Sequence, residues 1–486
     1  MTNTYSSILD VTKALNLTRK QPDPDLPVVC IQGLGFVGTA MAIAVATAMD
    51  DNGNPCFNVI GVDLPNPMGE EKVNALNTGI LPIESTDPKL QEYYEIAHNN
   101  GNLIATTDAS VFSLASTILV DVHLDVIDNA GEFDIGLTDF RKAIATVGSY
   151  MQADCLVVIE TTVPPGACEY VVVPELKKAF ESRGLPTDNI LVAHSYERVM
   201  PGNNYLNSII NFWRVFSGYT EAAADRCEAF MSKVINVDEY PLTRLHSTNA
   251  SETSKVLENS FRAMNIAFIE EWSRFAEAAG IDLFEVINAI RIRPTHKNIM
   301  QPGFGVGGYC LTKDPLFAEL AAEKLFGLKG IEFPFCKQAV MTNREMPLVS
   351  LDKLRSLFNG SLENKKILLL GVSYRQDVGD TRYSPSETFV VKAQEEGAKL
   401  GYHDPLVPYW HEMKSDMPEN IPDPKDYDAI VFALPHKEYT ELDIPEWLGD
   451  AKPIILDANN VLSHAMRDSI RSHGISIHSI GRGEGL

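Results

Sequence analysis

The apolar positions between residues 28 and 62 follow two different patterns. Residues 28–31 and 57–62 are short continuous apolar runs, and residues 38–49 between them are rich in Ala, Val and Ile. The short runs predict buried strands and the longer segment predicts a buried helix, which together make a βαβ unit. Because similar strand-like runs alternate with helix-like segments further on, we expect a parallel, doubly wound sheet covered on both faces. These later runs are residues 116–122, 155–159 and 190–193.

Residues 248–279 carry one long helical pattern. Apolar or small side chains recur there at three- and four-residue spacing, namely Val256, Leu257, Ser260, Phe261, Met264, Ala267, Phe268 and Trp272. This spacing predicts a helix that Gly280 would end. At a rise of about 1.5 Å per residue the helix would exceed about 40 Å, more than one small domain needs. It is either a dimer interface or a spine that joins two domains.

The alternation of strands and helices returns near residue 362. We expect a polar loop at 371–380, a helix at 385–396 and strands at 366–370, 399–402, 429–434 and 453–457. The predicted fold class is therefore α/β, with two Rossmann-like, doubly wound parallel sheets joined by a central helical domain that contains one long helix. The predicted parts are an N-terminal extension (1–27), a Rossmann domain (28–240), the central helical domain (241–350) and a C-terminal Rossmann-like domain (351–486). Residues 481–486 are expected to form a flexible tail.

Charge and composition narrow the classes of function. The 486 residues include 41 Lys and Arg against 65 Asp and Glu, a formal net charge of −24. Such a charge repels phosphate backbones and anionic lipid, so neither a nucleic acid nor a membrane is an expected partner. The seven cysteines are scattered without a CxxC pair, and the eleven histidines show no HxxxH spacing. We therefore expect neither a disulfide framework nor a metal site, and a cytoplasmic location.

The segment Gly33-Leu34-Gly35-Phe36-Val37-Gly38 is a GxGxxG motif between a predicted strand and a predicted helix. In that context the three glycines permit a tight turn, close approach of a pyrophosphate and close helix–strand packing. The helix N-terminus would supply free N–H groups for the phosphates. Asp63 ends the next strand, 25 residues after Gly38. A carboxylate there binds ribose hydroxyls and repels a 2′-phosphate, which favours NAD over NADP. The alternative is a purely structural glycine turn.

A second glycine-rich segment, residues 303–308, precedes Cys310. Glycines let backbone amides wrap closely around a ligand. Lys313, and any helix N-terminus after Pro315, would favour the nucleophilic thiolate form of Cys310. The alternative is that Cys310 is a small core residue.

Two further groups of polar residues are candidates for a site. Lys255 and Asn259 share one face of the long helix, with Arg262 on the next turn, although such a face is often only solvated. Glu197 follows the predicted strand 190–193, and ligands of open α/β sheets bind at the carboxyl ends of strands. Glu197 is either a catalytic base or a surface carboxylate paired with Arg198.

With these motifs in order, residues 28–480 resemble the UDP-glucose/GDP-mannose dehydrogenase family. The matching segments are GLGFVG at 33–38, ETTVPPG at 160–166, SYERVMPG at 195–202, KVLENSFRAMNIAF at 255–268, GFGVGGYCLTKDP at 303–315 and GVSYRQDVGDTRYSPS at 371–386. The resemblance implies oxidation of the sugar 6-hydroxyl of a nucleotide sugar to a carboxylate, with two NAD⁺ and no metal. It also implies that the C-terminal domain binds the nucleotide sugar.

The resemblance assigns roles to the candidate residues. Cys310 is the expected nucleophile, which forms a thiohemiacetal and then a thioester. Lys255 is expected to stabilise oxyanions or shuttle protons, with support from Asn259. Asp314 is expected to orient water or Lys255, and Glu197 to activate water.

The cofactor and substrate sites are likewise implied by the resemblance. Besides the glycine motif and Asp63, Thr162 is expected on the NAD side of the site. The expected substrate-binding residues are Arg198, Val199, Arg262, Arg293, Gly307, Tyr374, Arg375 and Arg382, with His296 in the same region as Arg293. The forked guanidinium groups of Arg375 and Arg382 suit a diphosphate.

Three departures from the family pattern stand out. Where the family has Val-x-x-Pro-Thr-Pro, residues 121–125 read Asp-Val-His-Leu-Asp, so the threonine is missing near Leu124. A common lysine of the C-terminal loop is Arg375. Residues 457–461 lack the usual arginine–glycine pair. The set Lys255, Asn259, Cys310 and Asp314 is complete, which indicates an active enzyme.

The motifs favour different substrates. The segment Glu197-Arg-Val-x-Pro-Gly resembles the branch that acts on UDP-N-acetylhexosamines, whereas residues 307–314 resemble UDP-glucose dehydrogenases. We favour a UDP-N-acetylhexosamine, with UDP-glucose second and GDP-mannose third, and a role in surface polysaccharide synthesis. The other hypotheses are a single-step hydroxyacid dehydrogenase and a non-catalytic NAD-binding scaffold. A homodimer or higher homo-oligomer is expected from the long helix.

Overall fold

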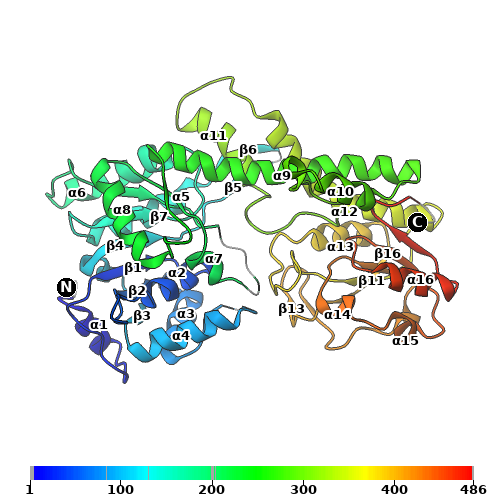
Figure 1. The fold of residues 1–486 in the computed structure, drawn as a ribbon, viewed down its shortest axis with the longest axis horizontal. Coiled ribbons are helices and arrows are strands. Elements are labelled where there is room, and N and C mark those ends of the chain that lie inside the picture. The colour runs from blue at the N-terminus through cyan, green and yellow to red at the C-terminus, as the bar shows by residue number, and fades with distance from the viewer. Residues whose placement is uncertain (1–4, 84, 130, 199–201, 203, 484–486) are drawn as a thin grey trace. The chain divides into compact units, whose positions relative to one another are not determined.

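The computed structural model describes residues 5–83, 85–129, 131–198, 202 and 204–483. The chain divides into two compact units. Unit 1 comprises Met1–Leu257 with Phe317–Glu332, and unit 2 comprises Glu258–Leu316 with Phe333–Leu486. The division falls within the long helix α9 (Thr248–Ala279), whose bounds confirm the prediction (Figure 1).

Unit 1 is built on one predominantly parallel sheet with the strand order β10-β9-β8-β7-β4-β1-β2-β3. Its strands are β1 (Val28–Gln32), β2 (Asn58–Val62), β3 (Leu103–Thr106), β4 (Ala115–Val120), β7 (Leu156–Ile159), β8 (Leu191–His194), β9 (Val215–Gly218) and β10 (Thr243–Arg244), with a separate hairpin of β5 (Val126–Asn129) and β6 (Glu132–Ile135). Its helices, besides the start of α9, are α1 (Ile8–Ala14), α2 (Phe36–Ala46), α3 (Pro67–Thr78), α4 (Pro88–Asn100), η1 (Ala109–Leu114), α5 (Leu137–Tyr150), the π-helical η2 (Cys168–Val172), α6 (Val173–Ser182), α7 (Asn207–Ile210), α8 (Glu221–Val234) and α11 (Phe317–Lys324).

Helix α2 explains why the stretch near residue 40 lacks charged side chains. Every residue from Gly38 to Ala46 is buried, because the helix packs against the sheet and against α4 and α7. A helix that is apolar all round is a buried helix. The pair β1–β2 is parallel with α2 between its strands, which confirms the predicted βαβ unit.

The sheet differs from the prediction at one edge. Strand β9 runs antiparallel to β8, with Ala193 opposite Gly218, whereas the neighbouring pairs β7–β8 and β9–β10 are parallel. The direction of a short apolar run cannot be read from its pattern, so the sequence did not reveal this reversal.

The N-terminal extension packs on the opposite edge of the sheet. Helix α1 buries Ile8 and Val11, and the Arg19 guanidinium donates a hydrogen bond to the backbone oxygen of Leu103 in the edge strand β3. The extension thereby protects a strand edge that would otherwise expose unpaired backbone groups.

Unit 2 contains a parallel sheet with the order β12-β11-β15-β16-β17. Its strands are β11 (Lys366–Leu370), β12 (Lys399–His403), β15 (Ala429–Phe432), β16 (Ile454–Asp457) and β17 (Ile477–Ser479), and β13 (Tyr409–Trp410) pairs with β14 (Ser415–Asp416). The helices are α10 (Leu283–Arg291), η3 (Pro294–His296), η4 (Asp314–Leu316), α12 (Pro334–Leu357), α13 (Pro385–Glu395), η5 (Pro424–Asp426), α14 (Lys437–Thr440), α15 (Ile444–Leu448) and α16 (His464–Ser472), together with the rest of α9.

Helices cover both faces of this second sheet (Figure 1). One face packs against α12 and α13, for example through Leu351 and Phe389, and the other packs against α14, α15 and α16. The strands predicted from residue 366 onward lie within one or two residues of their observed bounds. The two doubly wound sheets and the long helix confirm the predicted fold class, while the predicted domain boundaries stay predictions.

The expected flexible tail is wrong for residues 481–483. The backbone N–H of Gly481 donates to Glu277 Oε1 at 2.8 Å, and Arg482 forms an ion pair with Asp282 at 2.8 Å. Gly483 N–H donates to the backbone oxygen of Ile281. The end of α9 and the start of α10 therefore bind this segment, a tertiary contact that a glycine-rich composition does not indicate. Residues 484–486 lie outside the described residues.

Of the helices in the described part of the chain, none combines the length and the apolar character needed to cross a bilayer.

Candidate active site

The GxGxxG motif forms a turn with no room for side chains. Gly33 has φ +98°, a conformation that favours glycine, and a Cβ there would lie 2.7 Å from the backbone oxygen of Asp121. A Cβ on Gly38 would lie 1.8 Å from the oxygen of Gly33. Gly35 is the N-cap of α2, and Phe36 and Val37 form its first turn. This loop therefore presents the helix N-terminus as the dinucleotide motif requires.

Asp63 lies where β2 ends, beside this loop. Its Oδ2 accepts the Leu34 N–H at 3.0 Å, and its Oδ1 accepts the Leu64 N–H at 2.7 Å. Lys72 Nζ lies 3.1 Å from Oδ2, with both side chains partly exposed. A carboxylate held at this strand end fits the ribose hydroxyls of NAD.

The loop after β7 contains Thr162 and is anchored by Glu252 on the first turns of α9. Glu252 Oε2 accepts the Gly166 N–H at 2.6 Å, and Oε1 accepts the Cys168 N–H at 2.8 Å. Burial raises the pKa of Glu252 to about 7. Thr162 is half-buried in this loop, and the anchor lies three residues before Lys255 on the same helix.

Buried acidic residues end two neighbouring strands, which the sequence analysis did not foresee. Asp121 follows β4, and Glu160 follows β7 with its Oε1 3.1 Å from Arg214 Nη1. Burial raises the pKa of Glu160 to about 7, against the opposing effect of Arg214. Burial, then the nearby negative charge of Glu160, raises the pKa of Asp121, whose carboxyl oxygens have no hydrogen-bond partner among the described residues. The sequence feature that could have predicted these two acids is a charged residue directly after an apolar strand.

Lys255 and Glu197 lie together in unit 1. Lys255 Nζ donates to the backbone oxygen of Glu197 at 2.7 Å, lies 3.9 Å from its carboxylate and 5.3 Å from the centroid of the Tyr196 ring. Both residues are buried. Glu197 is therefore not a surface carboxylate, and the Lys255 ammonium group faces its side chain.

Arg198 points to other partners. Its Nη1 donates to the backbone oxygen of Trp213 at 2.8 Å, and its Nη2 donates to the Tyr196 hydroxyl at 3.1 Å. Val199, another expected substrate residue, lies outside the described residues.

His194, the last residue of β8, is buried beneath this group. Its Nδ1 lies 2.7 Å from Ser251 Oγ on α9, and Ser251 Oγ lies 2.6 Å from Ser217 Oγ on β9. Burial, then the positive charge of Lys255, lowers the pKa of His194 to about 3. The imidazole is therefore neutral at physiological pH.

In unit 2 the structure brings Asn259 and Asp314 together. Asn259 Nδ2 donates to Asp314 Oδ2 at 2.7 Å, and Lys313 Nζ lies 2.9 Å from Oδ1 of the same buried carboxylate. The Cys310 thiol is exposed, and its backbone oxygen accepts the Asp314 N–H at 3.0 Å. The cysteine and the carboxylate thus share one tight turn before η4.

The glycines before Cys310 are required by packing. A Cβ on Gly305 would lie 2.5 Å from Pro385, and a Cβ on Gly307 would lie 2.6 Å from the oxygen of Tyr383 and 2.7 Å from Tyr374. The segment thus lies against the loop that follows β11. Gly307 and Tyr374, both expected substrate residues, are in direct proximity.

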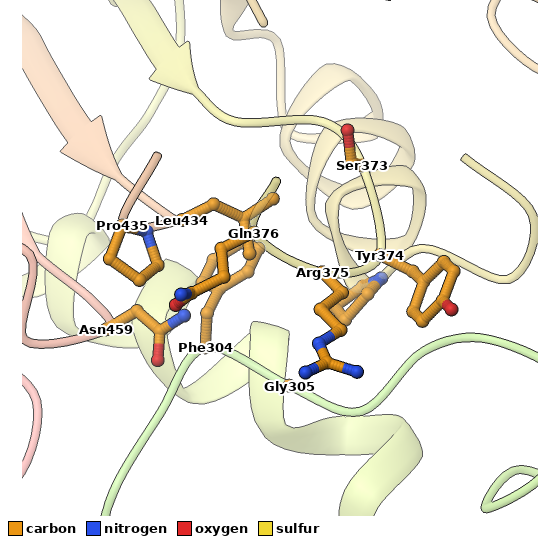
Figure 2. Close-up of a pocket in the computed structure, with 10 residues that line it drawn as sticks. Phe304, Gly305, Ser373, Tyr374, Arg375, Gln376, Leu434, Pro435 and Asn459 are labelled. Atoms are coloured by element: carbon orange, nitrogen blue, oxygen red, sulfur yellow. The ribbon is translucent and has the colours of Figure 1, made fainter. Parts of the chain in front are cut away.

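A cavity of about 310 Å³ lies at the carboxyl ends of the unit 2 strands. That volume is at the small end of ligand pockets. Its lining combines one cation with polar and apolar side chains, from Phe304, Gly305, Ser373, Tyr374, Arg375, Gln376, Pro385, Leu434, Pro435 and Asn459 (Figure 2). Among these, only Tyr374 and Arg375 were expected. Of the others, Ser373, Gln376, Leu434, Pro435 and Asn459 follow the ends of strands, Phe304 and Gly305 belong to the glycine-rich segment, and Pro385 begins α13. The strand-end rule that pointed to Glu197 would also have pointed to the first five.

Other expected substrate residues do not line this cavity. Arg382 is bound to Asp380 through two hydrogen bonds of 2.9 and 2.6 Å and lies 5.1 Å from the Tyr309 ring centroid. Arg262 is exposed on α9, and Arg293 is exposed just before η3. Across the described ranges, no group of three or more His, Cys, Asp or Glu side chains could hold a metal ion.

Family models match the chain in three consecutive parts. The NAD binding domain of the UDP-glucose/GDP-mannose dehydrogenase family matches residues 28–235, the central domain matches 249–345 and the UDP binding domain matches 368–464. Together with the glycine loop and Asp63, these matches define an NAD-dependent oxidoreductase. The chain belongs to the UDP-glucose/GDP-mannose dehydrogenase family.

Individual relatives cover almost the whole chain. A UDP-N-acetyl-D-mannosamine dehydrogenase of Methanocaldococcus jannaschii is 29% identical over 94% of this chain and 97% of its own length. The structure of a UDP-D-ManNAc dehydrogenase from Pyrococcus horikoshii has a TM-score of 0.77 at 26% identity, covering 94% of this chain and 99% of the other. That of an NDP-N-acetyl-D-galactosaminuronic acid dehydrogenase from Methanosarcina mazei has a TM-score of 0.76 at 26% identity, covering 98% of both chains.

Replacing Asp63 tests the cofactor site. We expect Asp63→Asn to weaken NAD⁺ binding by about tenfold to a hundredfold, since hydrogen bonds to a charged group contribute about 1.5–3 kcal/mol, and to improve the relative binding of NADP⁺. The dissociation constants of both dinucleotides measure this. Glu70→Gln makes the same charge change at an exposed position of α3 and should leave the ratio unaltered. An unaltered ratio in Asp63→Asn would place the ribose elsewhere.

The lowered pKa of His194 predicts an acid-dependent loss of stability. Below pH 6.5 the unfolded chain binds a proton at this imidazole that the folded chain excludes down to about pH 3. Stability is therefore complete above pH 6.5 and falls by up to about 1.4 kcal/mol per pH unit below it. Urea unfolding followed by circular dichroism between pH 4 and 7 should show a shallower slope for His194→Asn, while His464→Asn, at an exposed position, keeps the wild-type slope.

Proposed function

We propose that this chain oxidises the 6-hydroxyl of a UDP-N-acetylhexosamine to the uronate in two NAD-dependent steps, through a thioester on Cys310. The observation that carries the proposal is the turn in which the exposed Cys310 accepts, at its backbone oxygen, the N–H of Asp314, whose carboxylate accepts a hydrogen bond from Asn259. The same stretch of chain contributes Phe304 and Gly305 to the unit 2 cavity. A nucleophile so close in sequence to a ligand cavity fits covalent catalysis on a bound substrate.

The first oxidation produces an aldehyde from the sugar alcohol. NAD⁺, when bound, accepts one hydride in each of the two oxidations. Lys255 is placed to stabilise the alkoxide as the hydroxyl proton leaves, because its ammonium is buried and already donates a hydrogen bond. Asn259, one helical turn from Lys255 on α9, supports the same oxyanion.

Cys310 then holds the aldehyde as a covalent adduct. Its sulfur bonds to C6 and the thiol proton ends on the former carbonyl oxygen, which gives a thiohemiacetal. Loss of a hydride from C6 and of the hydroxyl proton gives the thioester. Water attacks the thioester carbonyl, the C–S bond breaks and the thiol regains a proton. The net change consumes one water and two NAD⁺ and yields a carboxylate, two NADH and three protons.

Two carboxylates serve the hydrolytic step in this proposal. Glu197 accepts a proton from the attacking water, since its carboxylate is buried beside Lys255. Asp314 orients Asn259 through their hydrogen bond and is itself fixed by Lys313. Both are proposed roles in general acid–base and electrostatic catalysis.

The nucleotide is proposed to bind at the carboxyl ends of the unit 2 strands. Arg375 in the cavity supplies a planar donor group for the diphosphate. Arg382 would bind the same group only after leaving Asp380, so we assign it a secondary role. Arg198, Val199, Arg262, Arg293, Gly307 and Tyr374 complete the proposed substrate set.

The choice of sugar rests on the relatives. Proteins named UDP-N-acetyl-D-mannosamine dehydrogenase and NDP-N-acetyl-D-galactosaminuronic acid dehydrogenase resemble this chain along almost all of it. We therefore favour a UDP-N-acetylhexosamine, with UDP-glucose second and GDP-mannose third. The uronate product suits surface polysaccharide synthesis, and the seven free cysteines suit the reducing cytoplasm.

Two alternative functions would use only some of the proposed catalytic and binding residues. A single-step hydroxyacid dehydrogenase would use Lys255 and Asn259 but would leave Cys310 without a role. A non-catalytic scaffold would bind NAD and form no NADH with any nucleotide sugar.

The stoichiometry of NADH formation separates these alternatives. With UDP-N-acetylmannosamine, UDP-N-acetylglucosamine, UDP-glucose and GDP-mannose as the panel, we expect two NADH per sugar from a UDP-N-acetylhexosamine. Cys310→Ala should abolish turnover, because no thioester can form. Cys56→Ala, at a partly buried cysteine of unit 1, should retain it. One NADH per sugar with an unaffected Cys310→Ala variant would indicate simple alcohol oxidation, and no NADH with NAD⁺ still bound would favour the scaffold.

We also propose that α9 carries a homodimer interface. Within unit 2 it exposes four aromatic side chains, Phe261, Phe268, Trp272 and Phe275, each 47–57% accessible. Edge-to-face contacts join Phe268 to Trp272 and Trp272 to Phe275. An exposed aromatic stripe of this kind is typical of the core of an interface.

Light scattering coupled to size-exclusion chromatography tests the dimer. The wild type should elute with at least twice the mass of 53.6 kDa, and Phe268→Glu with Trp272→Glu should reduce it to one chain, since two buried charges would face the aromatic stripe. Phe335→Glu, on the exposed start of α12, should stay dimeric. A monomeric wild type would leave α9 as a spine.

A further inference from the structure

The walls of the unit 2 cavity belong to loops that leave different strands. Residues 373–376 follow β11, Leu434 and Pro435 follow β15, and Asn459 follows β16. Such loops have no ladder of backbone hydrogen bonds to fix them. Their positions depend on side chains behind the walls, which do not themselves line the cavity.

Asp404, directly after β12, holds the start of the first wall. Its Oδ2 accepts hydrogen bonds from the backbone N–H groups of Val372 and Ser373 at 2.8 and 2.9 Å, and from Ser373 Oγ at 2.7 Å. Its Oδ1 accepts the Leu406 N–H at 3.0 Å. Burial alone would raise the pKa of Asp404, but the hydrogen bonds from His436 and Ser373 lower it below its usual value. The carboxylate is therefore ionised and accepts only.

His436 continues the second wall, directly after Pro435, and its side chain is 1% exposed. Its Nε2 lies 3.2 Å from Asp404 Oδ2, and its Nδ1 accepts the Asp377 N–H at 3.2 Å. A backbone amide can only donate and the Asp404 carboxylate can only accept. The pattern therefore places a proton on Nε2 and leaves Nδ1 as an acceptor.

Both hydrogen bonds of His436 reach the segment that carries Arg375. The first is the bond to Asp404, whose carboxylate binds the Val372 and Ser373 amides that precede Arg375. The second is the bond from the Asp377 amide, which follows Arg375 in the chain. The imidazole thus clamps both ends of residues 373–376 and ties them to the wall at Leu434 and Pro435. In Figure 2 these two walls face the cavity together, with the Arg375 guanidinium extending from the first.

We propose that His436 is a positioning residue for nucleotide binding, which fixes Arg375 by donating from Nε2 to Asp404 and accepting the Asp377 N–H at Nδ1. The inference rests on the proposed function, because it takes the cavity as the site of the uridine diphosphate. Loss of either hydrogen bond frees one end of the clamp, so that binding must order the loop at a cost in affinity. The chemical steps use other residues and are unaffected.

A buried histidine next to this one provides a matched control. His403 Nδ1 lies 2.8 Å from the Tyr439 hydroxyl, which donates to the backbone oxygen of His403 at 2.7 Å. His403 belongs to the same core, and it is not among the residues that line the cavity. Replacing it disturbs packing beneath the site without opening the clamp.

Two amide substitutions separate the two hydrogen bonds. In His436→Asn the side-chain oxygen can take the place of Nδ1 and accept the Asp377 N–H, while the donor to Asp404 is lost. In His436→Gln the side-chain nitrogen can take the place of Nε2, while the acceptor for Asp377 is lost. His436→Ala loses both.

The experiment uses the full chain and measures the Kd of UDP by calorimetry, with KM and kcat for the sugar that turns over in the panel. One hydrogen bond contributes about 0.5–1.5 kcal/mol. We therefore expect the Kd and the KM to rise about threefold to tenfold in His436→Asn and in His436→Gln, and further in His436→Ala. The kcat of each variant should change less than about twofold. His403→Asn should change thermal stability as much as the His436 variants do, and it should leave the Kd of UDP unaltered. Hydrogen exchange at the Asp377 amide should accelerate in His436→Gln, which lacks the acceptor, and stay slow in His436→Asn, which keeps it.

Specific results would overturn the inference. If the wild type binds UDP and the folded His436→Asn and His436→Gln variants bind it equally well, His436 does not position the site. The same conclusion holds if His403→Asn weakens binding as much, because the effect would then follow general stability. If the wild type does not bind UDP, the proposed nucleotide site itself fails.

Discussion

A carboxylate that accepts hydrogen bonds from backbone N–H groups holds a functional loop at four places in this chain. Asp63 holds the glycine motif, Glu252 the loop after β7, Asp404 the loop after β11 and Asp457 the loop that contains Asn459. A loop amide has no partner in a helix or a sheet, and leaving it unpaired when buried is costly. The two oxygens of a carboxyl group can accept several such hydrogen bonds at once. The fold therefore places an acid behind each of these four loops.

Glycines supply the second constraint, and they serve the chain's own packing as much as any ligand. Gly38 makes room for Gly33, and Gly305 and Gly307 make room for the segment after β11. Both glycine motifs therefore bring two pieces of backbone closer than any side chain would allow. The turn that contains Cys310 consequently begins from a fixed surface, which the proposed role of Cys310 as a nucleophile requires.

Electrostatics differ between the two units. In unit 1 the buried acids Asp121 and Glu160 have pKa values raised by burial, and only Glu160 is paired to an arginine. In unit 2, Asp314 and Asp404 each receive several hydrogen bonds. The converging donors lower the pKa of Asp404, whereas burial raises the pKa of Asp121, whose carboxyl oxygens have no donor among the described residues.

Local sequence patterns were enough to predict most helices and strands and to find the two glycine motifs. The bounds of α9 and β11, the βαβ unit around Gly33–Gly38 and the position of Cys310 after a glycine segment follow from local spacing, because helix and strand periods repeat within a few residues. The groups that hold the loops became visible only in the folded chain. His436 meets Asp377 across 59 positions and Glu252 meets Gly166 across 86, and neither partner differs locally from an ordinary surface residue. Their roles arise because parallel strands bring distant loops to one sheet edge, where each buried amide must find an acceptor.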